Sequence, residues 1–569
     1  MYVVAVPNRG SPPAILLRES YREDGKVKNR TVANLTHWPP EVVEGLKILL
    51  KGGKAVATPE EIFEKVEDRH HGHVQAVLTA MQRLGLANIL ASQPSRERNL
   101  VLAMIAARIL DPGSKLATTR WWKVTTLPEV LGVADAKEDD LYAALDWLIE
   151  RQDRIERKLV KRHLDEDSLV LYDLTSTYVE GSHCPLAELG YSRDRKRGKL
   201  QINFGLLTDS RGCPVSTTVY PGSTGDPATM LEQVEYLQGL FGLKRIALVG
   251  DRGMISQRQV DVFKEKDGID WITALKTPQI RSLLEQRYIQ LGLFDEQNLF
   301  EFTHPDYPGE RLIACRNPEL AKLRAHKRHD LLAATTRELA KIQAMAKRGA
   351  LKGQGEIGVR IGRIINQYKV AKHFHLEIAD DSFTFRILDD QVAAEAALDG
   401  IYVIRTSLPD TRLDTADTVR TYKLLAQVER AFRSLKMMDL KVRPIYHYTE
   451  DRVRAHIFLC MLAYYVEWHM REAWRELLFT DEDQEAKATR DPVAPAKRSE
   501  AAIAKVQSRI LDDGTAVHSF QTLLNDLSGI VKSTCRRKGD TGKNLTFETV
   551  TELNETRRRA LNLLEKIAL

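Results

Sequence analysis

The sequence predicts an α/β protein in which a helical region precedes a mixed sheet. Three observations lead to this fold class. Residues 59–164 repeat apolar positions with helical spacing. From residue 168 onward, short apolar runs of strand length appear, and helical segments separate several of them. Buried strands that alternate with helices are typical of a sheet covered by helices, so we expect an α/β core after the helical region.

The composition is that of a globular protein. Of the 569 residues, 43% are hydrophobic, and 84 Lys and Arg stand against 78 Asp and Glu, for a net charge of +6. The apolar fraction is sufficient for more than one packed core, which excludes a disordered chain. The net charge is too small for this length to indicate a partner, so any indication of nucleic-acid binding must come from local clusters of bases.

Cysteine usage and hydropathy indicate the compartment. The five cysteines are scattered and never form a C-x-x-C pair, which argues against a disulfide framework and a standard zinc cluster. His456 and Cys460 share a helix face, but two ligands do not make a closed zinc site, and we interpret them as structural. The longest apolar run, 457–466, has ten residues, about half of the ~20 that a membrane-spanning helix needs. We therefore expect a buried helix there, and a soluble intracellular protein without membrane contact.

The sequence divides into four regions. In order, they are a small β-rich or irregular lead-in (1–55), a helical domain for binding or dimerisation (56–165), the α/β domain (166–478), and a linker with a C-terminal appendage (479–569). An insertion interrupts the α/β domain at about 280–400. Within it we expect a polar helix at about 318–348 and a strand pair across Asp380 and Asp381.

Two acids stand at the ends of apolar strands. Asp173 ends the run that begins at Ser168, and Asp251 follows the run 245–250. In open α/β sheets, ligand-binding groups gather beyond the carboxyl ends of parallel strands, so the pair indicates a metal site. Each acid taken alone is equally compatible with a helix cap or a turn.

A third acid lies in a basic helix predicted at about 416–437. Glu429 borders the apolar stripe of this helix, and Tyr422 and Lys436 lie one heptad before and after it on the same side. One carboxylate among many bases suits a metal ion held against a phosphate backbone. The alternative is an ordinary surface ion pair between Glu429 and Arg433.

These segments together resemble the DDE insertion-sequence transposases, in the group whose third acid lies in a Tyr-Arg-Glu-Lys signature. The matching segments are DLTSTYVEG from Asp173, ALVGDRGMIS around Asp251, and YKLLAQVERAFRSLK from Tyr422. The acids are 78 and 178 residues apart, and the longer interval contains the insertion. The order and spacing of the motifs carry the resemblance, which covers about 168–470.

The resemblance implies a ribonuclease-H-like catalytic core with a β-rich insertion, and a metal-dependent enzyme that cuts and joins DNA at the ends of its element. Asp173, Asp251 and Glu429 would be the catalytic and metal-binding triad, with Tyr422 and Lys436 positioning DNA or the acid. Clustered carboxylates repel one another unless divalent cations offset their charge, and such oxygen ligands suit Mg²⁺ or Mn²⁺, with two ions expected. The expected partners are double-stranded DNA, as terminal inverted repeats and target, and a second copy in a homodimer on DNA.

A basic segment between the first acid and the next strand is expected to contact the DNA backbone. The segment RDRKRGK, 193–199, has five bases and one acid. A solvated turn is the alternative for such a charge run. The residues for which we predict DNA contact, in this segment and on the basic helix, are Arg193, Arg195, Lys196, Arg197, Tyr422, Arg433 and Lys436.

One position departs from the signature. Leu425 stands three residues after Tyr422, where the family has Arg, so this contact is either absent or supplied by another base such as Lys423. The departure leaves open a catalytically inactive DNA-binding repressor derived from a transposase. A ribonuclease-H-like nuclease that cuts without joining is a further alternative. No Gly-Lys pair precedes Ser or Thr, so a phosphate-binding loop of the ATPase type is not predicted.

Overall fold

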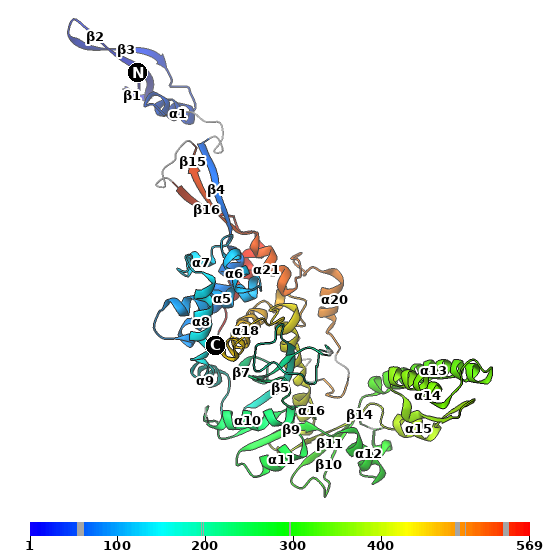
Figure 1. Ribbon diagram of the computed structural model, residues 1–569. Helices are drawn as coiled ribbons and strands as arrows, with labels where there is room; N and C mark the ends of the chain where they lie inside the picture. Colours follow the sequence, from blue (N-terminus) through cyan, green and yellow to red (C-terminus); the bar gives the residue numbers. More distant parts are fainter. Residues whose placement is uncertain are drawn as a thin grey trace. The chain divides into compact units, whose positions relative to one another are not determined.

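Figure 1 shows the computed structural model of the chain. The structure describes residues 1–53, 62–194, 196, 198–239, 241–294, 297–483, 490–494, 497–538 and 546–568. The chain forms two compact units. The smaller one consists of Met1–Arg69 and Val531–Thr551, and the larger one of His70–Ile530 and Glu552–Leu569. This division differs from the four predicted regions, because the helical region and the α/β region lie in one unit.

The smaller unit contains two three-stranded sheets. The first is an antiparallel meander of β1 (Tyr2–Asn8), β2 (Ser11–Glu23) and β3 (Lys26–Asn34), followed by α1 (Pro40–Leu50). The second combines β4 (Phe63–His70) with β15 (Val531–Arg537) and β16 (Thr546–Val550). Strands from near the C-terminus therefore complete a sheet that begins in the N-terminal part of the chain.

The larger unit begins with the helical region that the apolar periodicity predicts, except that residues 63–70 of this region form strand β4. The helices are α3 (Gly72–Arg83), α4 (Leu86–Leu90), α5 (Arg96–Leu110), α6 (Lys115–Trp122), α7 (Leu127–Val130), α8 (Glu138–Ile149) and α9 (Gln152–His163). Side-chain caps determine where some of these helices begin. At the start of α5, for example, the Ser95 hydroxyl accepts a hydrogen bond from the N–H of Arg98.

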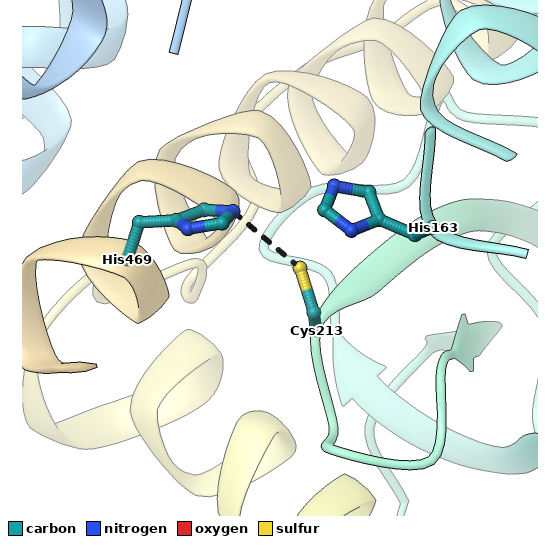
Figure 2. Close-up of side chains that lie close together, drawn as sticks. All are labelled: His163, Cys213 and His469. Carbon is teal, nitrogen blue, oxygen red and sulfur yellow. Dashed lines mark hydrogen bonds between the residues drawn. The ribbon is translucent and has the colours of Figure 1, made fainter. Parts of the chain in front are cut away.

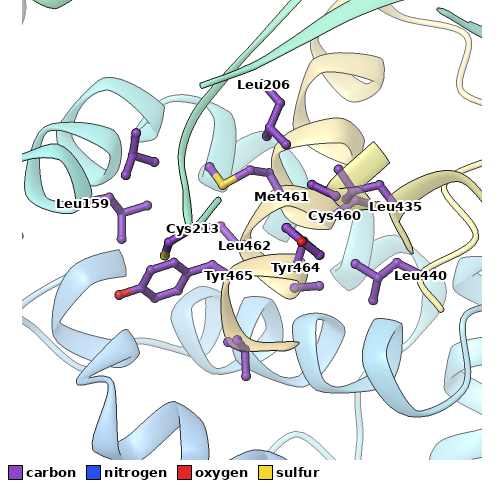
Figure 3. Close-up of a cluster of buried hydrophobic side chains, with 14 of the residues drawn as sticks. Leu159, Leu206, Cys213, Leu435, Leu440, Cys460, Met461, Leu462, Tyr464 and Tyr465 are labelled. Carbon is purple, nitrogen blue, oxygen red and sulfur yellow. The ribbon is translucent and has the colours of Figure 1, made fainter. Parts of the chain in front are cut away.

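A long helix, α18 (Glu450–Ala473), forms the centre of the core. It contacts α3, α5 and α8 as well as strand β7 (Pro214–Pro221) of the main sheet. Figure 1 shows α18 beside α5 and α8. Every residue of the predicted apolar run, 457–466, is buried. Figure 3 shows how Met461, Leu462 and Tyr465 of this helix pack among side chains from the sheet and from α9. A helix that is apolar all round is stable only when other elements surround it, so the prediction of a buried helix is confirmed.

The main sheet has eight strands in the order β10-β11-β14-β9-β8-β5-β6-β7. Besides β7, they are β5 (Leu169–Tyr178), β6 (Gln201–Thr208), β8 (Ile246–Val249), β9 (Ile269–Ala274), β10 (Leu299–Phe302), β11 (Arg311–Arg316) and β14 (Ile401–Thr406). β5, β6 and β7 form an antiparallel meander, whereas β5, β8 and β9 are parallel neighbours. The predicted class, a mixed sheet with flanking helices, is confirmed.

The predicted insertion, about 280–400, contains the four strands β10 to β13 but has more residues in helices than in strands. Between β11 and β14 lie α13 (Pro318–Lys347), α14 (Gln354–Tyr368), the short η2 (Ala371–His373), the hairpin β12 (Phe374–Ile378) and β13 (Phe383–Ile387), and α15 (Asp389–Ala396). The polar helix and the strand pair are where the sequence predicts them. The β-rich description is wrong because α14 buries one apolar stripe, including Ile357 and Ile361, in a small core of its own.

The remaining helices connect and cover these parts. They are α10 (Asp226–Gly239), α11 (Gln257–Lys264), α12 (Thr277–Glu285), η1 (Leu291–Phe294), α16 (Thr415–Lys423), α17 (Leu425–Arg433), the π-helical turn η3 (Ser434–Met438), η4 (Arg475–Leu477), α20 (Glu500–Ser508), α21 (Phe520–Ser528) and α22 (Glu555–Glu565). The single helix predicted at about 416–437 is thus three consecutive elements. In the described part of the chain, no helix has the length and apolar character needed to cross a bilayer.

Candidate active site

The parallel pairing of two central strands aligns the first two predicted acids. In the parallel pair of β5 and β8, Val170 lies opposite Leu248 and Leu171 lies opposite Val249. Asp173, within β5, is two residues after Leu171. Asp251, just after β8, is two residues after Val249. The sheet thus aligns the two acids on neighbouring strands. The prediction that Asp173 ends its strand is wrong, because β5 continues to Tyr178, whereas Asp251 does follow the end of β8.

Helix α17 brings the third acid to β5. The helix contacts β5, its Val428 is buried, and the ring of Phe432 meets that of Phe204 on β6 edge-on at 5.5 Å. Glu429 follows Val428 and is exposed. Its carboxylate makes no hydrogen bond or ion pair with any residue that the structure describes, and the predicted alternative, an ion pair with Arg433, does not form. An acid without a partner, on a helix that contacts the strand of Asp173, is available for a ligand.

Burial and the charges of the other two acids raise the pKa of Asp173. Burial raises the pKa of this half-buried carboxyl to about 7, and the charges of Asp251 and Glu429 add to the rise. The N–H of Leu174, which donates to Asp173 Oδ1 at 2.8 Å, and the nearby Arg193 oppose it. Both other acids therefore lie close enough to Asp173 to disfavour its ionised form.

Asp251 is held by its own turn. Its Oδ1 accepts hydrogen bonds from the N–H groups of Gly253 and Met254, each at 2.8 Å. A Cβ at Gly253 would lie 3.2 Å from Oδ1, a close approach that favours glycine at this position. The Asx turn fixes the carboxylate and leaves the side chain exposed.

Tyr422 faces the same group of acids from α16. Burial raises the pKa of its hydroxyl to about 12, with further contributions from the charges of Asp251, Glu429 and Asp173. A phenol within reach of three carboxylates stays protonated at neutral pH and can donate a hydrogen bond.

Lys436 turns inward. After Arg433 the chain winds into the π-helical turn η3, and Lys436 becomes buried. Its Nζ donates to the main-chain oxygen of Ser176 on β5 and to Asp194 Oδ1, both at 2.9 Å. Arg443 also donates to Asp194. The structure thus makes Lys436 a link between η3 and the strand that carries Asp173.

Three of the other bases with predicted DNA contacts lie in the described part of the chain. Arg433 and Lys196 are exposed, and Arg193 is half-buried, with its main-chain N–H donating to Ser176 Oγ at 3.0 Å. Arg195 and Arg197 lie outside the described residues. DNA contact by these bases stays a prediction.

Leu425, which stands where the signature has Arg, is accommodated by apolar packing. Leu425 begins α17 and packs, half-buried, against the main core. Lys423 donates to the main-chain oxygen of Pro492, so its ammonium group does not replace the missing guanidinium at the acids. Arg193 is the cation that lowers the pKa of Asp173.

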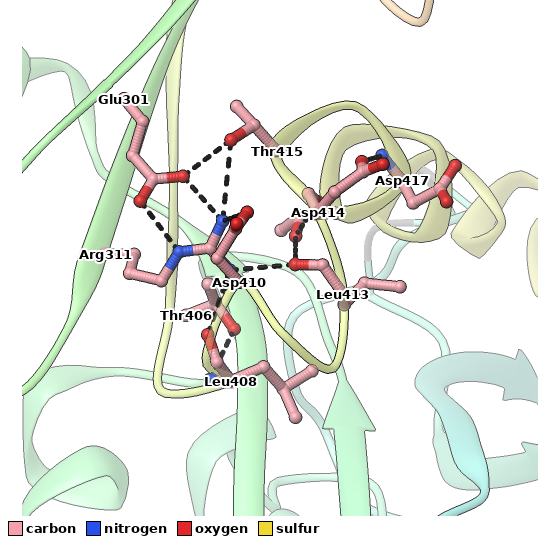
Figure 4. A network of polar contacts seen from close by, with 10 residues as sticks. Glu301, Arg311, Thr406, Leu408, Asp410, Leu413, Asp414, Thr415 and Asp417 are labelled. Atoms are coloured by element: carbon pink, nitrogen blue, oxygen red, sulfur yellow. Dashed lines mark hydrogen bonds and ion pairs between the residues drawn. The ribbon is translucent and has the colours of Figure 1, made fainter.

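A polar network fixes the start of the helices that carry Glu429. Arg311 on β11 forms a bidentate pair with Glu301 on β10 and donates to the main-chain oxygens of Leu408 and Leu413, at 3.0 and 2.9 Å. Glu301 also accepts a hydrogen bond from Thr415, the first residue of α16 (Figure 4). This network ties the edge of the sheet to the loop that leads into α16.

Two polar residues of the site escape the sequence analysis. Asp194 is the one acid within the basic segment, which was a usable signal, and it pairs with both Lys436 and Arg443. Ser176 lies on the same strand as Asp173, but it contributes a main-chain oxygen, which no side-chain pattern reveals.

Comparisons with known proteins identify the family. No curated protein matches the chain. Among solved structures, a cryo-EM structure of a piggyBac transposase synaptic complex with hairpin DNA is similar over 80% of this chain and 76% of that chain, at 9% sequence identity and a TM-score of 0.35. The model of the IS1634 family transposase N-terminal domain matches residues 4–61. The model of the transposase DDE domain matches residues 165–466, more than half of the chain. The chain therefore belongs to the DDE transposases of insertion sequences, which are DNA-binding, metal-dependent enzymes that cleave and transfer DNA strands.

Proposed function

We propose that Asp173, Asp251 and Glu429 are the catalytic triad of this transposase. The observation that carries the proposal is the parallel register that aligns the first two acids, with α17 packed on β5 beside them. The raised pKa of Asp173, to which Asp251 and Glu429 contribute, supports it.

The donor set fits hard divalent cations. Three carboxylates provide oxygen ligands alone, and their mutual repulsion is what a cation offsets, so we propose that they hold two Mg²⁺ or Mn²⁺ ions. When bound, such ions would activate the attacking oxygen and stabilise the leaving oxygen at a scissile phosphate.

The chain's own residues orient the triad. The N–H groups after Asp251 fix its carboxylate, and the N–H of Leu174 holds Asp173 Oδ1. Lys436 holds the main chain of β5 through Ser176. Positions fixed before DNA binds need no reorganisation during the reaction.

The order and direction of five strands support a ribonuclease-H-like core. β7, β6 and β5 form an antiparallel meander, and β8 and β9 continue from β5 as parallel strands. The triad then lies on the first and fourth strands of this core and on a helix that contacts the first.

We further propose the DNA partners and the assembly. Arg193 contributes positive charge near Asp173, and Lys196 and Arg433 are exposed, which suits contact with the DNA backbone of the element's inverted repeats and of the target. A homodimer on paired DNA ends, in the cytoplasm of a prokaryotic cell, is the arrangement in which one such site per end would cut and join.

The experiment compares Asp173→Asn, Asp251→Asn and Glu429→Gln with the parent chain. Each variant is incubated with the ends of the element that encodes it and Mg²⁺ or Mn²⁺. We expect loss of cleavage with DNA binding retained, whereas the control Asp261→Asn, an exposed acid on α11, retains cleavage. Cleavage by any triad variant would remove that acid from the site.

A second assay tests joining. A pre-cleaved element end is incubated with target DNA and the parent chain. We expect joined products. If the enzyme cuts but forms no joined products, it is a nuclease that cuts without joining.

A further inference from the structure

A second cluster of possible ligands lies apart from the three acids, and its donor atoms differ in kind. We propose that His163, Cys213 and His469 bind one divalent transition-metal ion of the zinc type. Their ligand atoms all lie within 4.8 Å of one another, and Cys213 Sγ is 3.8 Å from His469 Nε2. Figure 2 shows both imidazole rings beside the sulfur. Within the described ranges, this is the one group of three or more such side chains.

The three residues come from separate elements. His163 ends α9, Cys213 lies immediately before β7, and His469 lies near the end of α18. Cys213 and His469 are buried and His163 is half-buried. A shared metal ion would therefore cross-link the helical region, the sheet and the central helix, at a place where three chain segments already meet.

The main chain fixes the sulfur. Asp209 Oδ1 accepts hydrogen bonds from the N–H groups of Arg211 and Cys213, each at 2.9 Å. Gly212, between them, has a φ of +86°, in the left-handed region that favours glycine. This turn holds the Cys213 side chain against the histidines without help from a metal.

One ring nitrogen of His163 already has a hydrogen-bond partner within the protein. Its Nε2 lies 3.0 Å from the hydroxyl of Tyr465, a contact that leaves Nδ1 as the ligand atom. A metal-bound imidazole commonly makes such a hydrogen bond with its other nitrogen.

Arg211 occupies the position that the metal would take at His163. Its Nη2 donates to Nδ1 at 3.4 Å, a long bond from a largely exposed side chain. Arg211 also holds Asp209 through Nε at 2.9 Å and stacks on Trp468. Loss of the weak contact to His163 therefore leaves two stronger ones in place.

The protonation states of the two histidines suit binding, whereas the thiol must lose its proton to bind. Burial lowers the pKa of His163 to about 4 and that of His469 to about 3, so both rings are neutral at pH 7 and have a free electron pair. Burial raises the pKa of Cys213, so the free chain holds a thiol. On binding, the S–H bond breaks, its proton passes to solvent, and the sulfur electron pair forms the bond to the metal.

The donor chemistry selects the metal. Two imidazole nitrogens and one thiolate are the ligands of zinc, whereas Mg²⁺ and Mn²⁺ prefer oxygen. A matched pair elsewhere in the core lacks the third ligand. Cys460 Sγ lies 3.9 Å from His456 Nε2, and both residues are buried. The Cys460 pair therefore serves as an internal control.

The test uses the full chain and Co²⁺, which reports sulfur ligation by absorption. Titration of the metal-free protein should produce a thiolate-to-cobalt charge-transfer band that saturates at about one ion per chain and disappears when Zn²⁺ is added. Cys213→Ser should abolish the band, whereas Cys460→Ser and Asp173→Asn should leave it unchanged. No band from the parent chain, or a band that persists in Cys213→Ser, would overturn the proposal.

A measurement on the parent chain alone decides the same question if Cys213→Ser does not fold. X-ray absorption of the zinc-loaded protein should show sulfur at about 2.3 Å and imidazole nitrogen at about 2.0 to 2.1 Å. A zinc environment of oxygen alone would assign the ion to the acids and exclude the proposed site. Because the readout is sulfur ligation, its outcome is independent of the catalytic role of the triad.

Discussion

The ammonium group of Lys436 donates a hydrogen bond to the main-chain oxygen of Ser176, three residues beyond Asp173 on the same strand. The same group pairs with Asp194 at 2.9 Å. Lys436, for which the resemblance implies a role in positioning DNA or the acid, therefore contacts the strand that carries the first acid. Its effect on the reaction would pass through the position of Asp173.

Lys436→Met is expected to reduce DNA cleavage with little change in DNA affinity. The variant keeps the apolar stem but loses both hydrogen bonds, which costs about 2 kcal/mol of stability, and a shift of Asp173 by about 1 Å would slow cleavage by about 100-fold. Single-turnover cleavage and DNA binding at several salt concentrations measure the two effects separately.

Arg433→Gln is the contrasting variant. It removes an exposed base from the same region, so the slope of log affinity against log salt should become shallower by about 0.9. An equal change of slope in Lys436→Met would mean that Lys436 contacts phosphate directly.

Glu156 is expected to make stability fall as the pH rises. It is fully buried, and its oxygens accept hydrogen bonds from Gln152, Ser216 and the N–H of Thr217. Burial raises its pKa from 4.5 to about 7. Between these values the unfolded chain loses the proton and the folded chain keeps it, so ionisation favours unfolding by up to about 3 kcal/mol above pH 7.

Glu156→Gln removes this titration and keeps the shape. Its unfolding free energy relative to the parent chain should therefore rise between pH 5 and pH 8 by up to about 3 kcal/mol, as measured by urea denaturation. Glu150→Gln, at an exposed acid just before the same helix, should show the same difference at both pH values. A constant difference for Glu156→Gln would contradict the assigned pKa.

Arg311→Met is expected to loosen the start of α16. The change leaves Glu301 with Thr415 as its partner and the carbonyls of Leu408 and Leu413 without their donor, at a cost of about 2 to 3 kcal/mol. Thermal unfolding and the cleavage rate should fall together, because α16 leads into α17 and Glu429. Arg316→Met, on the same strand, is the control, since the Arg316 side chain makes no hydrogen bond or ion pair with the residues that the structure describes.

The insertion is expected to be removable without loss of the sheet. Arg316 pairs with Ile401 across β11 and β14, and the N–H of Asn317 donates to Gly400 at 2.9 Å. Deletion of residues 318–399 joins Asn317 to Gly400, which gives an Asn-Gly turn between paired strands, the preferred sequence of a two-residue hairpin. Far-ultraviolet circular dichroism and limited proteolysis should report a folded protein.

A deletion that is one residue longer supplies the control. Removal of 318–400 leaves Asn317 alone between Arg316 and Ile401, and a single residue cannot close this antiparallel pair. If both deletions unfold the protein equally, the insertion is required for the sheet itself.

Sequence and structure agree where the signal is local. Asp173 and Asp251 were identifiable because each follows a short apolar run, although only Asp251 follows the end of its strand, since β5 continues past Asp173 to Tyr178. The run 457–466 was identifiable as a buried helix from its composition and length. The β-rich insertion failed as a prediction because it rested on the resemblance, whereas the apolar stripe of α14 was present in the sequence.

The amino-acid sequence by itself determined the family, the α/β class and the three candidate acids, because motif order, strand ends and apolar periodicity are properties of short segments. Only the tertiary structure decided that Lys436 faces inward, since a π-helical turn changes the side that a heptad position occupies. It alone brought together His163, Cys213 and His469, which are 50 and 256 residues apart along the chain. Which distant segments come together depends on how helices and strands pack. The spacing of residues along the chain does not predict it.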